Sequence, residues 1–84
     1  MRKVAVGLVC LAMAAAAARA DDLAACSTRR VELSKQAEDF TGSPRIKRLI
    51  QADLNRAGSE IPEGDADECM EALEHATNLL AGRY

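Results

Sequence analysis

Residues 43–57 read SPRIKRLIQADLNRA, and this stretch carries a complete helix signature. Ser43 offers an N-cap hydroxyl, and Pro44 suits the first helical position because its φ is already fixed near the helical value. Apolar residues then recur at i, i+3, i+4, i+8 and i+11, the spacing of one buried helical face. We predict a helix over residues 44–57 that ends at Gly58. Its buried face consists of Ile46, Leu49, Ile50, Leu54 and Ala57.

Upstream, a second amphipathic pattern predicts a helix over residues 22–40. Asp21 and Asp22 suit its N-terminus. One position of the apolar stripe is occupied by Arg30, whose long side chain we expect to lie along the edge of the core. The stripe itself consists of Leu23, Cys26, Leu33, Ala37 and Phe40.

Downstream, a third pattern predicts a helix over residues 65–81. Residues 59–64 contain proline and glycine and have the composition of a turn. Asp65 is the expected N-cap, Glu68 completes a capping-box arrangement, and Gly82 is the stop signal. The apolar stripe of this helix consists of Ala66, Cys69, Met70, Leu73, Ala76 and Leu80.

Residues 1–20 have the three-part pattern of a secretory signal peptide. A positively charged start precedes an apolar stretch that ends in the small-x-small sequence Ala18-Arg19-Ala20. The alternative, an uncleaved anchor, needs about 20 apolar residues, and the stretch is shorter. We predict a periplasmic or secreted bacterial protein, with no membrane attachment after cleavage, whose mature domain spans residues 21–84. That domain has eight basic and thirteen acidic residues, a net charge of −5.

Two cysteines remain in the mature domain, Cys26 and Cys69. Export places them in a compartment where disulfides persist. A core of this size rarely supplies more than about 3–5 kcal/mol. A disulfide between the two would add roughly 4 kcal/mol in the chain-entropy model. Free or metal-binding thiols are the alternative, but no CxxC spacing accompanies them. We predict an all-α fold, a compact bundle of three short helices closed by this disulfide.

Acidic residues are concentrated around the third predicted helix. Seven lie between Glu60 and Glu74, and no basic residue occurs between Arg56 and Arg83. At about 100° per residue, six polar side chains fall within an arc of roughly 120° opposite the apolar stripe. Repulsion between acids at i, i+3 and i, i+4 costs on the order of 0.2–0.5 kcal/mol per pair, which a cation would remove. The six residues of this ridge are Asp67, Glu68, Glu71, Glu74, His75 and Asn78.

The ridge allows two functions. Carboxylates at this spacing suit a hard cation such as calcium or a lanthanide, and the predicted metal ligands are Asp67, Glu68, Glu71 and Glu74. His75 and Asn78 are candidates for a supporting role. Because a single helix face leaves coordination positions open, a metal-bridged homodimer is a natural consequence. The alternative is a solvated face of a metal-free periplasmic adaptor or inhibitor, which meets a basic protein partner.

Other function classes are disfavoured by the composition. A net negative domain lacks the basic surface that nucleic acids require. An enzyme is not expected, since no serine or cysteine nucleophile has an apparent histidine-carboxylate relay. The single histidine, His75, is weak evidence for zinc or copper because no second imidazole or thiolate accompanies it.

The combination of a signal peptide, 64 mature residues, two cysteines and an acidic helix resembles the LanD-like small periplasmic proteins encoded in the lanthanide-uptake clusters of methylotrophic bacteria. The resemblance spans the mature chain at the level of architecture. It implies a surface site of few carboxylate ligands, metal-centred dimerisation, and transfer of the metal to another periplasmic metal-binding protein. In this sequence the implied site falls among Asp67, Glu68, Glu71 and Glu74.

Overall fold

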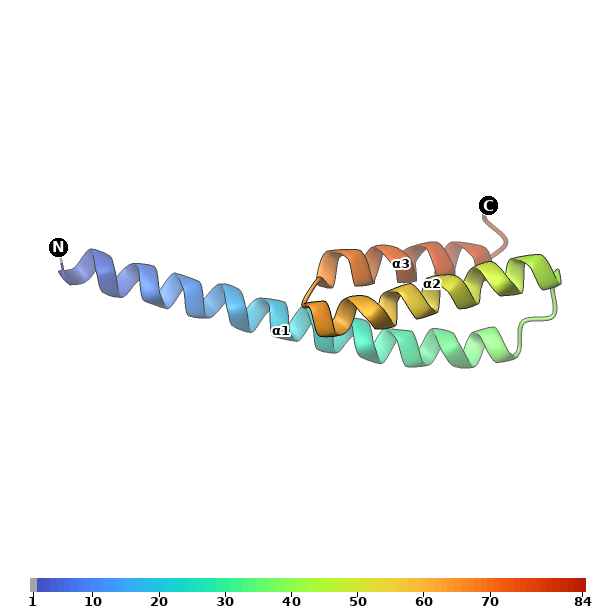
Figure 1. Cartoon of the computed structure of the whole chain (residues 1–84), viewed down its shortest axis with the longest axis horizontal. Helices are drawn as coiled ribbons and strands as arrows, with labels where there is room; N and C mark the ends of the chain where they lie inside the picture. The colour runs from blue at the N-terminus through green and yellow to red at the C-terminus, as the bar shows by residue number, and fades with distance from the viewer. Residues whose placement is uncertain (1) are drawn as a thin grey trace.

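The computed structural model describes the backbone of residues 2–84 and the side chains of residues 20–84. Three helices follow one another: α1 (Arg2–Glu38), α2 (Pro44–Glu63) and α3 (Ala66–Leu80). Figure 1 shows the C-terminal half of α1 beside α2 and α3, with α2 antiparallel to both, and each helix contacts the other two. The predicted three-helix, all-α bundle is confirmed. The molecule measures 62 × 20 × 18 Å because the N-terminal half of α1 continues past the α2–α3 turn.

α1 is longer than the predicted helix over residues 22–40. It is continuous from Arg2 to Glu38 and therefore joins the predicted signal peptide, residues 1–20, to the bundle. The side chains of residues 1–19 lie outside the described part of the structure, and the signal peptide stays a prediction. At its other end α1 stops before Phe40, which packs against the core from the loop. Among the residues with described side chains, no helix has the length and hydrophobicity needed to cross a membrane.

α2 extends beyond its predicted end, so the prediction that Gly58 stops the helix is wrong. Gly58 lies inside α2 and is crossed by the guanidinium group of Arg30. A Cβ at this position would lie 2.8 Å from the guanidinium carbon, so the close approach favours glycine here. The predicted turn over residues 59–64 is mostly helical as well. Pro62 lies close enough to the end of α2 that its missing N–H leaves only the Gly58 carbonyl without its helical donor. Glycine at position 58 is therefore explained by a contact between helices and is not a helix stop.

The actual end of α2 is a Schellman motif at Gly64. Gly64 adopts the left-handed conformation, with a φ of 75°, which glycine reaches without steric cost. Its N–H donates to the carbonyl of Ile61, and the N–H of Asp65 donates to the carbonyl of Glu60, both at 3.1 Å. α3 ends in the same way at Gly82, whose φ is 76°. The predicted stop at Gly82 is confirmed.

The predicted N-caps of α2 and α3 are also confirmed. Ser43 Oγ accepts a hydrogen bond of 3.2 Å from a backbone N–H of the first turn of α2, and Asp65 Oδ1 accepts one of 3.0 Å from Glu68 N–H. The second half of the capping box is absent. The Asp65 N–H is already bonded to Glu60, and the Glu68 carboxylate is bonded to Arg56 instead.

The core is formed along the predicted stripes with two exceptions. Leu49 and Met70 were expected inside but are 42% and 44% exposed. On α3, Ala72 and Leu79 are buried although neither lies on the predicted stripe, so the buried face of α3 is rotated from that stripe, away from Met70. The buried cluster consists of Cys26, Leu33, Ala37, Ile46, Ile50, Leu54, Ala57, Cys69, Ala72, Leu73, Ala76 and Leu79.

The predicted disulfide between Cys26 and Cys69 is present. It joins α1 to α3 with a Cα–Cα distance of 6.3 Å. At the opposite interface, Arg30 Nε donates a hydrogen bond of 2.7 Å to the carbonyl of Leu54 and so joins α1 to α2. Arg30 lies along the core edge as expected, but its head group bonds to backbone.

Candidate functional site

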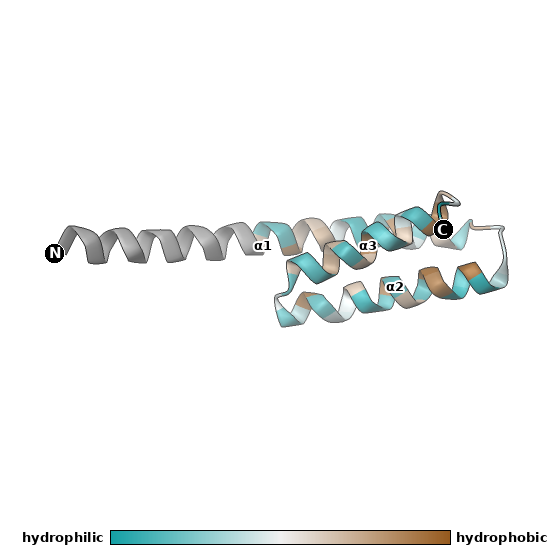
Figure 2. Cartoon of the chain, turned by 90° about the horizontal axis from the view of Figure 1, so that it is seen from above, coloured by the Kyte–Doolittle hydropathy of each residue, from teal (hydrophilic) through white to brown (hydrophobic). Residues whose placement is uncertain are grey.

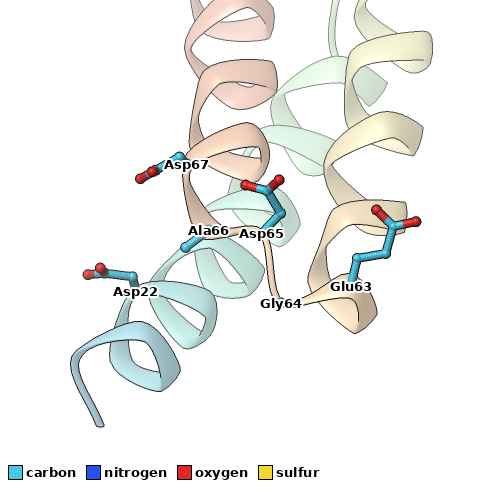
Figure 3. Close-up of a pocket in the computed structure, with 6 residues that line it drawn as sticks. All are labelled: Asp22, Glu63, Gly64, Asp65, Ala66 and Asp67. Carbon is cyan, nitrogen blue, oxygen red and sulfur yellow. The ribbon is translucent and has the colours of Figure 1, made fainter. Parts of the chain in front are cut away.

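The acidic surface of the molecule is centred on the α2–α3 turn. An open depression there is lined by four carboxylates that come from α1, α2 and α3, and we call these residues the acidic turn. Figure 3 shows their side chains spread in different directions and not toward a common centre. All four are exposed. The residues of the acidic turn are Asp22, Glu63, Asp65 and Asp67.

Negative charges in this region repel one another. Partial desolvation raises the pKa of Glu60, and the charge and hydrogen bonding of Glu63 raise this pKa further, with smaller contributions from Asp65 and Glu68. The fully charged state of this end of the bundle is therefore unfavourable at neutral pH. A cation or a cationic surface would relieve it.

The orientation of α2 adds to this unfavourable charge. The last turn of α2 contains no basic residue and carries Glu60 and Glu63 close to the negative end of the helix dipole. Its first turn contains no acidic residue and carries Arg45 and Lys47 close to the positive end. Both ends of α2 thus have the charge that destabilises a helix. In α3, by contrast, Asp67 and the N-cap lie at the favourable end.

The residues of the predicted ridge on α3 contact different neighbours. Glu68 Oε2 accepts a hydrogen bond of 2.5 Å from Arg56 Nη2, and the pKa of Arg56 is raised mainly by this bond. His75 Nδ1 lies 2.5 Å from Oδ2 of the largely buried Asp53. These two contacts connect α3 to α2 and occupy two of the six ridge residues.

The other four ridge residues lie in two places. Asp67 belongs to the acidic turn. Glu71, Glu74 and Asn78 line a shallow depression between α2 and α3, together with the Asp53–His75 pair and Arg56. Glu71 and Glu74 form no ion pair with any described residue. The six residues that the sequence places on one helix face therefore have three different environments: contacts with α2, the acidic turn, and the shallow depression between α2 and α3.

A preformed metal centre is not found on this ridge. Within residues 20–84, no three histidine, cysteine, aspartate or glutamate side chains are grouped so that they could hold a metal ion. The predicted metal ligands Asp67, Glu68, Glu71 and Glu74 remain a prediction that would require side-chain rearrangement.

Three members of the acidic turn, Asp22, Glu63 and Asp65, are not among the predicted site residues, and Asp65 is predicted only as an N-cap. The position of Asp22 could have been predicted from the sequence if the Cys26–Cys69 disulfide is assumed. Cys26 and Cys69 lie side by side on parallel helices, so residues one helical turn before each cysteine are neighbours as well. These residues are Asp22 and Asp65. Glu63 could not be placed because the extension of α2 to Glu63 was itself missed.

The opposite end of the bundle carries basic residues. Four exposed side chains from the last turns of α1 and the first turns of α2 lie close to the α1–α2 loop, and we call them the basic end: Lys35, Arg45, Lys47 and Arg48. Figure 2 shows hydrophilic positions along all three helices. Basic residues predominate at this end, where Glu38 and Asp39 also lie, whereas no basic residue among residues 20–84 lines the acidic turn.

Comparison of this chain with protein-family models, with curated proteins and with solved structures finds no match.

Proposed function

We propose that this chain is an exported interaction module that binds a basic protein partner through the acidic turn. The observation that carries the proposal is that Glu63 of the acidic turn and the nearby Glu60 are placed where they cost stability. Glu60 and Glu63 oppose the dipole of α2, and Glu60 has a raised pKa among like charges. Helix stability does not account for these residues, whereas recognition of a cationic surface does.

The geometry of the acidic turn agrees with protein binding. Its carboxylates come from three helices and spread over an open surface, so they match a broad cationic surface better than a single small ion. The distant position of the basic end leaves the negative potential uncompensated. Such a potential accelerates association with a basic partner and makes binding weaken as salt is raised.

A pair of matched double variants tests this proposal. Glu63→Gln with Asp67→Asn removes two charges from the acidic turn without touching the Asp65 cap. Glu38→Gln with Asp39→Asn removes two charges beside the basic end, so the net charge of both variants is identical. Each immobilised protein is exposed to periplasmic extract in the presence of a chelator, and bound proteins are released with salt.

We expect the unmodified chain and the Glu38/Asp39 variant to retain the same basic protein, and the Glu63/Asp67 variant to lose it. Equal retention by both variants would contradict the proposal. Retention that requires removal of the chelator would favour metal binding instead.

A hard-metal site is the second candidate, favoured by the depression that Glu71 and Glu74 share with Asn78 and the Asp53–His75 pair. Together with Asp67 and Glu68 these glutamates are the proposed ligands of a lanthanide or calcium ion, with a metal-bridged homodimer and transfer to another periplasmic metal-binding protein, as the LanD-like resemblance implies. Calorimetric titration with lanthanum, calcium and zinc tests the site.

Under this second candidate, Glu71→Gln with Glu74→Gln should abolish the heat of lanthanum binding and the dimer seen by light scattering. The Glu38→Gln, Asp39→Asn variant should keep both. No heat at micromolar metal would rule out the carrier function.

A further inference from the structure

The three interfaces of the bundle are held by different kinds of bond. One side-chain hydrogen bond joins α1 to α2, and two short polar contacts join α2 to α3. Between α1 and α3, residues 20–84 form no side-chain hydrogen bond or ion pair, and the Cys26–Cys69 disulfide is the specific link. Apart from apolar packing in the shared core, the disulfide is thus the one link described between α1 and α3.

The disulfide is also shielded from solvent. Both cysteine side chains are 0% exposed and belong to the same buried cluster as Leu33 and Leu73. A disulfide is broken by direct attack of a thiolate on one of its sulfurs. An external thiol therefore has to wait until the bundle opens.

The reduced chain has a much weaker fold. A disulfide that closes a loop with a sequence separation of 43 residues stabilises a domain by restricting its unfolded chain, to an extent comparable with the whole stability of a bundle this small. Without the bond, the chain spends much of its time open, with both thiols accessible to an oxidant.

We propose that the Cys26–Cys69 pair is a one-way redox latch. Under reducing conditions the chain remains largely open. When a disulfide oxidant is present, each thiol loses its proton, the two sulfurs bond, and two electrons pass to the oxidant, which becomes two thiols. The bundle then closes over the new bond and protects it from reduction.

Closure of the latch also assembles the acidic turn, because it brings Asp22 of α1 beside Asp65 at the start of α3. Here the inference rests on the proposed function. In an exported protein, the precursor stays open in the reducing cytoplasm, as translocation requires, and the partner-binding surface forms only after oxidation outside. The latch itself does not depend on a partner.

The rate of disulfide reduction tests the latch. The full chain carries Cys10→Ser so that Cys26 and Cys69 are its only cysteines. It is oxidised with oxidised glutathione, treated with dithiothreitol at increasing urea, and sampled by alkylation of free thiols. We expect reduction in the absence of urea to be slower than in unfolding urea by roughly 10³-fold or more, the smallest equilibrium constant usual for a folded domain. Equal rates in the two conditions would overturn the latch.

Two variants on α1 serve as a matched pair. Leu33→Ala weakens the core beside the disulfide and should accelerate reduction, whereas Val31→Ala changes an exposed side chain and should leave the rate unchanged. Equal acceleration by both variants would contradict shielding by the core.

A urea titration of the same chain in dithiothreitol completes the test. The reduced chain should unfold at much lower urea than the oxidised chain, or show no cooperative transition. A reduced chain as stable as the oxidised one would overturn the proposal. If the latch holds but the extract experiment above retains no partner, the proposed function alone fails, since the reduction assay uses no partner.

Discussion

At the α2–α3 end of the bundle the chain reverses direction through Gly64 and Asp65, whereas at the α1–α2 end it uses residues 39–43. The tight reversal brings acids of α2 and α3 together, and Asp22 of α1 joins them through the disulfide-linked pairing of α1 with α3. The longer reversal lies among the residues of the basic end. Each group lies at the end of α2 that its charge destabilises. For α2, helix stabilisation therefore does not account for these charges. Lys35 in the last turn of α1 and Asp67 in the first turn of α3, by contrast, lie at the favourable ends of their helices.

The disulfide lies closer to the acidic end, and removing it should have the largest effect. We expect Cys26→Ala with Cys69→Ala to lower the free energy of unfolding by about 4 kcal/mol. Hydrogen exchange would locate the change, with greater loss of protection in α1 around residue 26 than at the start of α2. A uniform loss of protection would show that the two ends open together.

The contact between Arg30 and Gly58 should have the next largest effect. Alanine is the better helix former by about 1 kcal/mol, yet a methyl group at position 58 would displace the guanidinium of Arg30 and break its hydrogen bond to the Leu54 carbonyl. A hydrogen bond from a charged group contributes about 1.5–3 kcal/mol, so Gly58→Ala should destabilise by about 0.5–2 kcal/mol. Thermal unfolding of Gly58→Ala, alone and combined with Arg30→Ala, would measure the coupling. If the second substitution did not recover part of the loss caused by the first, the steric explanation would be wrong.

A negative charge at the basic end should stabilise the protein modestly. Ser43→Asp keeps the N-cap and adds a charge beside the positive end of α2 and its basic residues, worth about 0.3–1 kcal/mol at low salt. Ser43→Ala, which removes the cap, should cost about 1 kcal/mol. Urea unfolding at low and high salt separates the two contributions, because only the charge effect should decrease in high salt.

A small stabilisation is expected at the acidic end from Glu60→Gln. The folded-state pKa of Glu60 is raised, so its contribution to stability is fully present below its unfolded pKa and is lost as the pH rises through the folded value. At neutral pH the charged side chain therefore destabilises the fold, and Gln should raise the melting temperature. In acid, where Glu60 is protonated, the variant and the original should melt together. A constant difference at all pH values would exclude the electrostatic cause.

Sequence patterns predict those parts of this fold that depend on local chemistry. The caps at Ser43 and Asp65, the stop at Gly82 and most of the apolar stripes follow from short-range rules. The end of α2 does not follow from such rules, since Gly58 lies inside the helix, in contact with the guanidinium group of Arg30 from another helix. Local propensity cannot contain such a contact between distant residues.

The candidate site is predicted less completely for a related reason. A helical wheel places Glu68 and His75 on the same exposed ridge as Glu71, but it cannot show that Arg56 and Asp53 of α2 engage them. The cluster at the α2–α3 turn requires the relative register of α1 and α3. The sequence predicts this register only if Cys26 is assumed to pair with Cys69.

The continuity of α1 through residue 20 has a consequence for the precursor. With a rise of about 1.5 Å per residue, the part of α1 that precedes Asp22 forms a rod of about 30 Å. The acidic turn lies beside the base of this rod, and the basic end lies at the far side of the bundle. Removal of residues 1–20, the predicted signal peptide, would take away this rod and leave Asp22 in the first turn of the shortened α1, where the positive end of the helix dipole favours its negative charge.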